Sequence, residues 1–210
     1  MQITEYDLEL DLSRQFARDA QPQRSAGTHI SDVIQWISRR TLHPERVPVE
    51  EMSQAEREQM CLYTSFGFSW EIVVRDALQK IWRREFPANP ARYIHVGEVQ
   101  KDGLSGSPDW VDVVEESVPE FKATWRSSKN DPFQEWIWQV KAYDYLLGFR
   151  KAEILAYFVN GNYRPSKPKI RGWKMEFTPR ELHDNWQMLL GNARAMQRER
   201  MKNGETSICI

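Results

Sequence analysis

Three short groups of residues near the middle of the chain have types and spacings that could do chemistry together. The groups are Gly106-Ser107-Pro108-Asp109, Glu120-Phe121-Lys122, and the pair Gln139 and Tyr143. Carboxylate oxygens are the ligands that hard divalent cations prefer, and such cations stabilise negative charge on phosphoryl oxygens and activate water. Two acids beside a lysine therefore predict a divalent-metal site that hydrolyses phosphodiester bonds.

The middle group has the spacing of a strand that carries its two charged side chains on one face. Side chains at i and i+2 of a strand point the same way, so Glu120 and Lys122 share a face while Phe121 points into the core. If the preceding strand pairs antiparallel through the turn near Ser117, Asp109 at its start reaches that face. Lys122 would then orient the attacking water or help to deprotonate it.

Residues on two predicted helices complete the candidate site. Glu71 lies four residues after Gly67 and is the natural third acid. Gln139 and Tyr143 are four residues apart, so they are neighbours on one helical face. Both side chains could donate hydrogen bonds to a phosphate or to a metal-bound carboxylate.

Other residues near these groups have weaker signals. Asp112 is a competing first acid, but it lies three residues beyond Asp109 and would face the opposite side of a regular strand. The better candidates for contacts with a nucleic-acid backbone are Lys101, Arg126, Lys129 and Lys141. Most of the tryptophans are expected in the core or at its rim, and Trp110 and Trp125, which flank the acids, are the candidates for stacking on bases. The histidines show no metal-ligand spacing and are expected to be structural or surface residues.

Turn and helix signals predict the elements that position the candidate site. Residues 1–27 form an arm with little periodicity, and Thr28 or Ser31 caps a helix after it. We expect further helices within 53–63 and over 67–84, strands over 92–99, 110–114, 120–125, 152–159 and 170–177, and helices from Asp131 to Leu147 and over 178–203. This order predicts a single α/β domain with a central mixed sheet flanked by helices.

Bulk composition fits a globular protein of ordinary size. The 210 residues are 40% hydrophobic and 28% charged, with a net charge of −1, so no global basic field exists and nucleic-acid contacts must come from local patches. No run is long and apolar enough for a membrane helix, and the N-terminus lacks a secretory signal, which predicts a cytoplasmic protein without a membrane partner. Two widely separated cysteines predict no cysteine-ligated cluster.

Taken in order, the motifs resemble those of a known enzyme superfamily. Gly67xxxGlu71, Gly106-Ser107-Pro108-Asp109, Glu120-Phe121-Lys122 and Gln139xxxTyr143 resemble the PD-(D/E)XK nucleases, in particular their RecB-like and lambda-exonuclease-like branches. The resemblance covers about residues 67–160 and implies a restriction-endonuclease-like core. We therefore expect a single nuclease domain with an N-terminal arm and helices over residues 1–60, a catalytic core over 67–177 and a C-terminal helix over 178–203. The resemblance also implies Mg²⁺ or Mn²⁺ bound by Asp109, Glu120, the Phe121 carbonyl and Glu71, with Lys122, Gln139 and Tyr143 as catalytic residues.

Two departures narrow the resemblance. Glu71 stands where some RecB-like enzymes have a histidine, and the four cysteines of an iron–sulfur cluster are missing. Both departures favour a compact phage-type or bacterial exonuclease that acts on DNA ends in recombination or repair. The resemblance allows a homo-oligomer and a partner annealing or recombination protein. Two alternatives stay open: a non-catalytic module that binds nucleic acid or protein, and a structure-specific endonuclease.

Overall fold

The computed structural model describes residues 27–39, 49–87, 92–129, 132–162 and 167–202. Its elements in chain order are β1 (Thr28–His29), α2 (Ile30–Arg39), the 3₁₀ turn η1 (Val49–Glu51), α3 (Gln54–Glu85), β2 (Tyr93–Ile94), β3 (Val99–Lys101), β4 (Leu104–Gly106), β5 (Val111–Asp112), β6 (Ser117–Thr124), α4 (Gln134–Leu147), β7 (Lys151–Phe158), β8 (Lys169–Glu176) and α5 (Pro179–Lys202).

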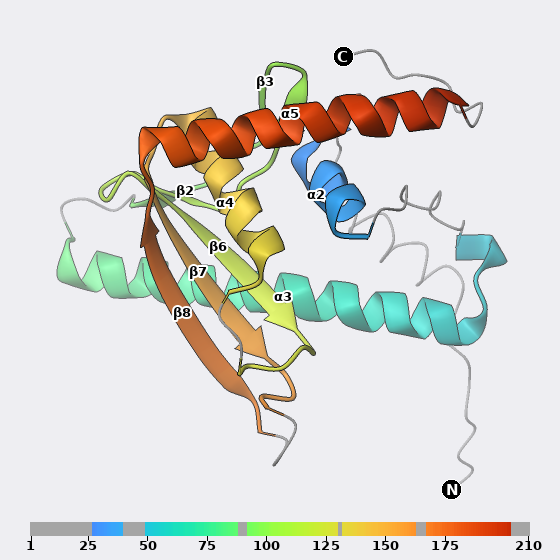
Figure 1. The fold of residues 1–210 in the computed structure, drawn as a ribbon. Helices are drawn as coiled ribbons and strands as arrows, with labels where there is room; N and C mark the ends of the chain where they lie inside the picture. Colours follow the sequence, from blue (N-terminus) through green and yellow to red (C-terminus); the bar gives the residue numbers. More distant parts are fainter. Residues whose placement is uncertain (1–26, 40–48, 88–91, 130–131, 163–166, 203–210) are drawn as a thin grey trace, which may run out of the picture.

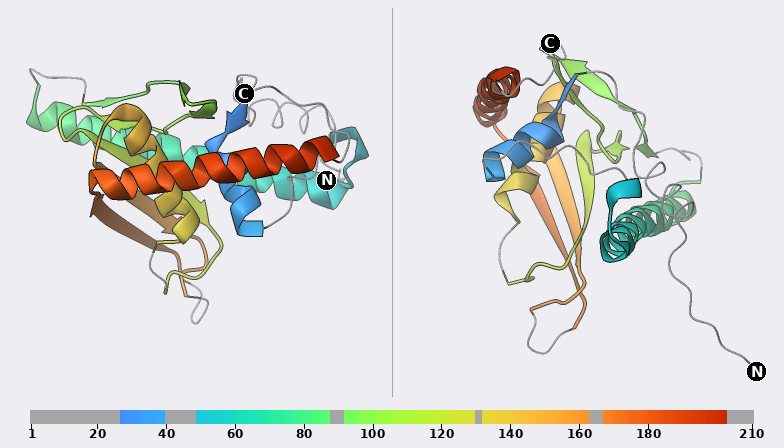
Figure 2. Two further views of the ribbon diagram at one scale, coloured as in Figure 1. Left: turned by 45° about the horizontal axis from the view of Figure 1, so that its top comes forward. Right: turned by 90° about the vertical axis from the view of Figure 1, so that its right-hand side faces the viewer.

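The strands form two sheets, both with parallel and antiparallel pairs. The larger sheet has the order β2-β5-β6-β7-β8, with β6 and β7 parallel and α4 as the crossover that a parallel pair requires. The smaller sheet has the order β1-β4-β3. Figure 1 and Figure 2 show α3 along one face of the larger sheet and α4 on the other. The expected fold class, α/β with a central mixed sheet flanked by helices, is confirmed. The division of the chain into an N-terminal region, a catalytic core and a C-terminal helix stays a prediction.

The two faces of β6 pack against different helices. Val118 belongs to the core formed with α2, α4 and α5, whereas the Trp125 ring, just beyond the strand, packs on Tyr63 and Phe66 of α3. Because side chains alternate along a strand, Glu120 and Lys122 share the α4 face with Val118. The apolar side chains of β6 thus fix which charged ones face α4.

The N-terminal helical region differs from the expectation. The helices expected within 53–63 and over 67–84 are one continuous helix, α3, which holds Gly67 in its interior. No proline interrupts residues 54–85, and an interior glycine costs only about 1 kcal/mol relative to alanine. Packing of α3 on β6 and β7 offsets that cost, as the contacts of Phe66 and Trp70 with Tyr157 show.

Two of the expected strands are shorter than the sequence pattern suggests. Gly97, with φ of 72°, divides the strand expected over 92–99 into β2 and β3, which belong to different sheets. The strand expected over 110–114 ends at Asp112, because its carboxylate accepts from the backbone N–H groups of Val114 and Glu115 and turns the chain. Apolar alternation does not reveal either interruption.

Several other boundaries agree with the sequence signals, but β6 begins at Ser117, within the expected turn and three residues before the strand expected over 120–125. Gly148 ends α4 with φ of 77°, and Thr178 and Glu181 form the capping box of α5. Helix α4 begins at Gln134, later than expected. Asp131, the arm over residues 1–26 and the loop that contains Pro44 and Pro48 lie outside the described residues.

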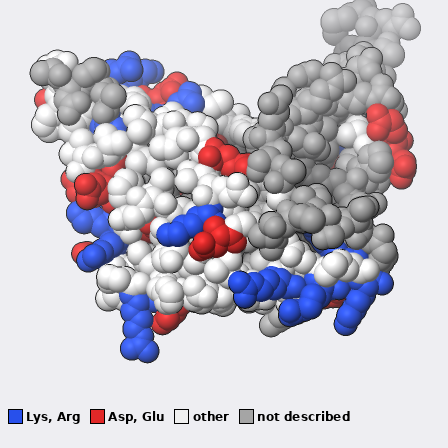
Figure 3. All heavy atoms as spheres, turned by 90° about the horizontal axis from the view of Figure 1, so that it is seen from above, with Lys and Arg blue, Asp and Glu red and all other residues white. Residues whose placement is uncertain are grey.

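Charges of both signs are scattered over the face of the molecule that Figure 3 shows from above. Lys and Arg lie at both ends of this face, among Asp and Glu. The C-terminal part of α5 carries exposed Arg194, Arg198 and Lys202. Within the described residues, no helix has the length and apolar character needed to cross a membrane.

Candidate metal-binding site at the edge of β6

The candidate site lies where one edge of β6 is not paired with another strand. β5 pairs with β6 only through Asp112 and Ser117, so the rest of that edge is not hydrogen-bonded to β5. There the backbone N–H of Phe121 donates to Oδ2 of Asp109 at 3.0 Å. The Gly-Ser-Pro-Asp group therefore closes the edge with a side chain instead of a strand.

The strand geometry also orients the Phe121 carbonyl. The N–H and C=O of one residue in a strand point to the same side, and successive residues alternate. The Thr124 carbonyl accepts from the Val159 N–H, so the backbone groups of the even-numbered residues of β6 point toward β7. Those of the odd-numbered residues, including Phe121, therefore point to the opposite, open edge. The carbonyl oxygen therefore lies on the same side of β6 as Asp109.

Lys122 links the strand to α4 through hydrogen bonds. Its Nζ donates to Oε1 of Glu120 and, at 2.9 Å, to Oε1 of Gln139. The Gln139 amide nitrogen donates in turn to the Tyr143 hydroxyl at 2.9 Å. These hydrogen bonds thus connect four of the candidate residues in series, from Glu120 through Lys122 and Gln139 to Tyr143.

Burial raises the pKa values of both Asp109 and Glu120. Burial, followed by the charge of Asp109, raises the pKa of Glu120 to about 8 against the opposing effect of Lys122. Burial also raises the pKa of Asp109, although Lys122 and the Phe121 N–H favour its charged form. Burial alone would lower the pKa of Lys122, but Glu120 and Asp109 outweigh it and the pKa is raised. Lys122 is therefore held as an ammonium ion.

Glu71 approaches the same edge from α3. Burial, followed by the charge of Asp109, raises the pKa of Glu71 to about 7, whereas Arg75 and Lys122 favour its charged form. The indole N–H of Trp110 approaches Glu71 without forming a hydrogen bond of good geometry. Glu71 also contributes to the raised pKa of Glu120, so all three candidate acids act on one another electrostatically.

The donors at this edge fit a hard divalent cation. Oε2 of Glu120, a residue only 1% exposed, has no hydrogen-bond partner among the described residues. An unpaired buried carboxylate oxygen costs free energy, and a cation satisfies it. With the Asp109 carboxylate and the Phe121 carbonyl, the donors are all oxygens, as Mg²⁺ prefers. Within the described chain, however, no three His, Cys, Asp or Glu side chains lie close enough together to form a ready metal-binding group.

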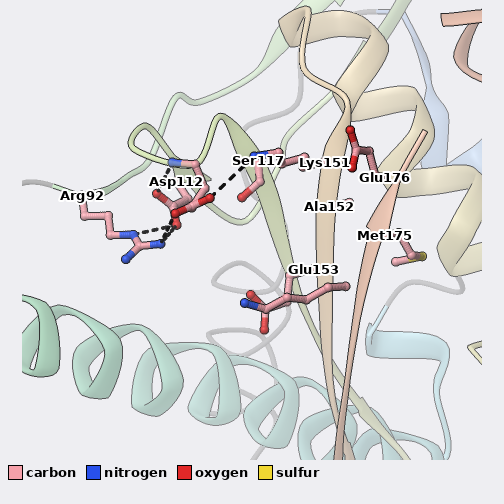
Figure 4. Close-up of a pocket in the computed structure, with 10 residues that line it drawn as sticks. Arg92, Asp112, Ser117, Lys151, Ala152, Glu153, Met175 and Glu176 are labelled. Atoms are coloured by element: carbon pink, nitrogen blue, oxygen red, sulfur yellow. Dashed lines mark hydrogen bonds and ion pairs between the residues drawn. The ribbon is translucent and has the colours of Figure 1, made fainter. Parts of the chain in front are cut away.

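Asp112, the competing first acid, has a different environment. Its carboxylate pairs with Arg92 at 2.6 Å and accepts the backbone N–H groups of Val114 and Glu115. Figure 4 shows Arg92 and Asp112 in a pocket together with Lys151, Glu153 and Glu176. The structure therefore gives Asp112 a structural role in the turn and leaves Asp109 at the edge of β6.

Two residues near the acids, His95 and Arg75, were not expected there from the sequence. His95, assigned above to structure or surface, is close enough to Asp109 to favour its charged form, and its ring meets Trp110 edge-on at 6.0 Å. The Arg75 guanidinium lies 5.3 Å from the centre of the Trp110 ring. Only the spacing of Arg75, four residues after Glu71, could have suggested it. His95 reaches the site through the pairing of β2 with β5, which spans 17 residues of chain and has no local signature.

The other candidates for nucleic-acid contacts mostly have partners within the protein. Lys101 lies over the Tyr145 ring, Lys141 over the Phe177 ring, and Arg126 pairs with Glu135. Lys129 is exposed and lines a separate cavity. The stacking roles of Trp110 and Trp125 stay predictions.

Comparisons with known proteins concern the fold. No protein-family model and no curated protein match the sequence. Among solved structures, the chain is similar to the protein SSO0001, with 12% identity and a TM-score of 0.49 over 90% of this chain and 84% of that chain. It is similar to a phage-related exonuclease from Haemophilus somnus 129PT, with 11% identity and a TM-score of 0.48 over 85% and 96%. It is also similar to the alkaline exonuclease LHK-Exo from Laribacter hongkongensis, with 13% identity and a TM-score of 0.46 over 89% of this chain and 98% of that chain.

Proposed function

We propose that the chain is a metal-dependent deoxyribonuclease that hydrolyses phosphodiester bonds with Mg²⁺ or Mn²⁺. The single observation that carries this proposal is the buried Glu120. One of its oxygens accepts from Lys122, and the other has no partner among the described residues, while the nearby Asp109 charge raises the pKa of this acid. Such an arrangement costs stability, which indicates a ligand-binding role rather than a structural one.

The proposed cation ligands are oxygens of Asp109, Glu120 and the Phe121 backbone, with Glu71 as a further ligand or support. A divalent cation held there would stabilise charge on the phosphoryl oxygens and lower the pKa of a bound water. The hydrogen bond from the Phe121 N–H fixes the orientation of the Asp109 carboxylate. The acid is therefore positioned by the backbone of the strand whose carbonyl is the third ligand.

Lys122 supplies the positive charge that contacts the substrate. Its ammonium form, stabilised by Glu120 and Asp109, is suited to donating a hydrogen bond to the attacking water or to a phosphoryl oxygen. Gln139 accepts one of the lysine protons and so limits the rotamers of the side chain. Tyr143 orients the Gln139 amide, which makes it a positioning residue.

Action on DNA ends is the more specific part of the proposal. The ordered motifs resemble those of lambda-exonuclease-like enzymes, and this resemblance supports an exonuclease of DNA recombination or repair. A structure-specific endonuclease would use the same acids and lysine. The two activities differ in their substrates, because an exonuclease needs a free end.

The decisive experiment compares end-labelled linear DNA with closed circular DNA, in Mg²⁺ and in chelator. We expect metal-dependent loss of the linear substrate only. In the same assay Glu120→Gln should lower the rate on the order of 100-fold or more, since it alters a proposed ligand of the cation. Glu153→Gln is the matched control, because Glu153 lies on β7 and its side chain points to the opposite face of the same sheet.

Each alternative has its own outcome in this experiment. Cutting of the circles selects an endonuclease. Unchanged rates in the Glu120→Gln protein contradict the site. If neither DNA is cut under any metal condition but linear DNA is still bound, the chain is a non-catalytic binding module.

A further inference from the structure

A second cavity, of about 460 Å³, lies at the end of the larger sheet. It is lined by residues that follow β6 and by the segments that connect β7 to β8, namely Ser128, Lys129, Gly161, Asn162, Lys167, Pro168, Lys169 and Arg171. Four of these residues are cationic and none is acidic. The chain as a whole has a net charge of −1, so this concentration of positive charge is a local property.

The pocket around Arg92 and Asp112 is also lined by charged residues, but its charges are of both signs. That pocket, of about 330 Å³, is lined by three cationic and four acidic residues, among them the Arg92–Asp112 ion pair. Its charges neutralise one another within the protein. The residues that line the cavity near Ser128 bring four positive charges together with no acid among them, and an anion is a ligand that would offset these charges.

Arg171 gives the basic cavity a fixed wall. Its Nη1 donates to the Ser128 carbonyl at 2.7 Å, and its guanidinium lies 4.6 Å from the centre of the Trp173 ring. Ser128, only 5% exposed, donates its own N–H to the Gly161 carbonyl at 2.7 Å. These contacts tie the segments after β6 and after β7 to β8, so the cavity is built by the fold.

The register of the sheet places this cavity near the candidate metal site. Lys122 is paired with Ala156 on β7, and Ala156 is paired with Arg171 on β8. Residues paired in this way point to the same face, so Arg171 and Lys122 share the face that α4 covers. Two strand spacings put their Cα atoms about 10 Å apart, which is the rise of about three nucleotides in one DNA strand.

We infer that the cavity lined by Lys129, Lys167, Lys169 and Arg171 binds a phosphate group of the DNA strand, a few nucleotides from the bond that is cut. Lysines are point charges that bind phosphate without reading the base, so the cavity would position the strand independently of sequence. This inference rests on the proposed function, because the strand is assigned as the substrate of the β6 site.

The test uses Lys167→Gln/Lys169→Gln, which removes two exposed lysines of the cavity. The matched control is Lys151→Gln/Lys174→Gln, which removes the same charge from the Arg92–Asp112 pocket of the same sheet. Binding of a fluorescent linear DNA with a single-stranded tail is measured in chelator by anisotropy at several salt concentrations. We expect the cavity variant to bind about tenfold more weakly, with a salt slope that is smaller by about 1 for each phosphate it no longer neutralises. The control should bind nearly as the wild type does.

Calorimetric titration with inorganic phosphate distinguishes a free anion from the DNA backbone. Equal DNA affinity and salt dependence in the two double variants would overturn the inference. So would inorganic phosphate binding that the cavity variant loses while its DNA binding is unchanged, since the ligand would then be a free anion. Failure of the proposed function appears separately, as wild-type cleavage by the Glu120→Gln protein or as no cleavage at all.

Discussion

Gly106 and Tyr143 approach so closely that a Cβ atom at position 106 would lie 2.6 Å from Cε1 of the tyrosine ring. The same atom would lie 2.8 Å from Cδ1 of Ile30. The first residue of the Gly-Ser-Pro-Asp group is therefore a glycine for a packing reason. Its small size lets α4 present the Tyr143 hydroxyl to Gln139, which holds Lys122.

Gly106→Ala tests this close packing. We expect it to lower the free energy of unfolding by about 1 to 3 kcal/mol, because the added methyl group forces a shift of a buried ring. Urea denaturation measures the effect. Gly191→Ala is the control, because apart from the neighbouring residues and backbone of α5 itself no atom lies within 4 Å of the added Cβ. Alanine also favours a helix, so that variant should be as stable as the wild type or more stable. Equal stability of the two variants would contradict the packing role.

Substitutions of Gln139 and Tyr143 should differ in severity. Gln139 accepts from the charged Lys122, and such a hydrogen bond is worth about 1.5 to 3 kcal/mol, whereas the bond between Gln139 and Tyr143 joins neutral groups and is worth about 0.5 to 1.5 kcal/mol. We therefore expect Gln139→Ala to lower kcat by more than Tyr143→Phe does. A larger loss in Tyr143→Phe, with normal folding by circular dichroism, would show that the hydroxyl acts directly on the substrate.

The two neighbouring aspartates should separate activity from stability. Asp109→Asn alters a proposed metal ligand and should abolish cleavage in a folded protein. Asp112→Asn weakens the pair with Arg92 and the turn after β5, so its main effect should be a lower melting temperature. The measurement compares the DNA cleavage rates of the two variants per folded molecule, well below the melting temperatures of both. If the Asp112→Asn protein lost cleavage while the Asp109→Asn protein stayed active, Asp112 and not Asp109 would be the metal ligand.

Asp144 predicts a dependence of stability on pH. It is fully buried in α4, neither of its carboxylate oxygens has a partner among the described residues, and burial raises its pKa to about 8. The folded state therefore keeps a proton that the unfolded state releases near its ordinary value of 3.8. Its contribution to stability is fully present below pH 3.8 and is lost as the pH rises toward 8.

Asp144→Asn removes this titration. Above pH 8 the variant should exceed the wild type in free energy of unfolding by about 1 to 3 kcal/mol, because an unpaired buried carboxylate costs that much or more. Near pH 4 the two proteins should be similarly stable. Urea titrations at a series of pH values measure the difference, and a constant difference from pH 4 to pH 9 would contradict the assignment.

The sequence predicted the parts of the fold that depend on local signals. The capping box at Thr178, the stop at Gly148 and the strand that carries Glu120 and Lys122 depend on neighbouring residues, and the structure contains all three. The continuity of α3 through Gly67 depends on packing against the sheet, which no local pattern records. The end of β5 depends on side-chain hydrogen bonds of Asp112, which apolar alternation does not reveal.

In the candidate site, too, local spacing predicted some residues and long-range contacts placed others. The i, i+2 spacing of Glu120 and Lys122 and the i, i+4 spacing of Gln139 and Tyr143 determine which side chains share a face. Contacts between distant segments brought in His95 and the N–H bond from Phe121 to Asp109. Such contacts depend on strand order and register, which were not readable from one sequence.

The outward-facing Phe121 carbonyl sets a limit on what mutagenesis of this protein can reveal. Every amino acid placed at position 121 keeps that oxygen, so a survey of substitutions would attribute all of the affinity for the proposed cation to side chains. Chemical synthesis offers a way around this limit. An ester in place of the amide that joins positions 121 and 122 makes the Phe121 carbonyl oxygen a weaker metal ligand and keeps every side chain. The same change removes the Lys122 N–H on the β7 side of the strand, so an ester at the next even-numbered position of β6 is its control.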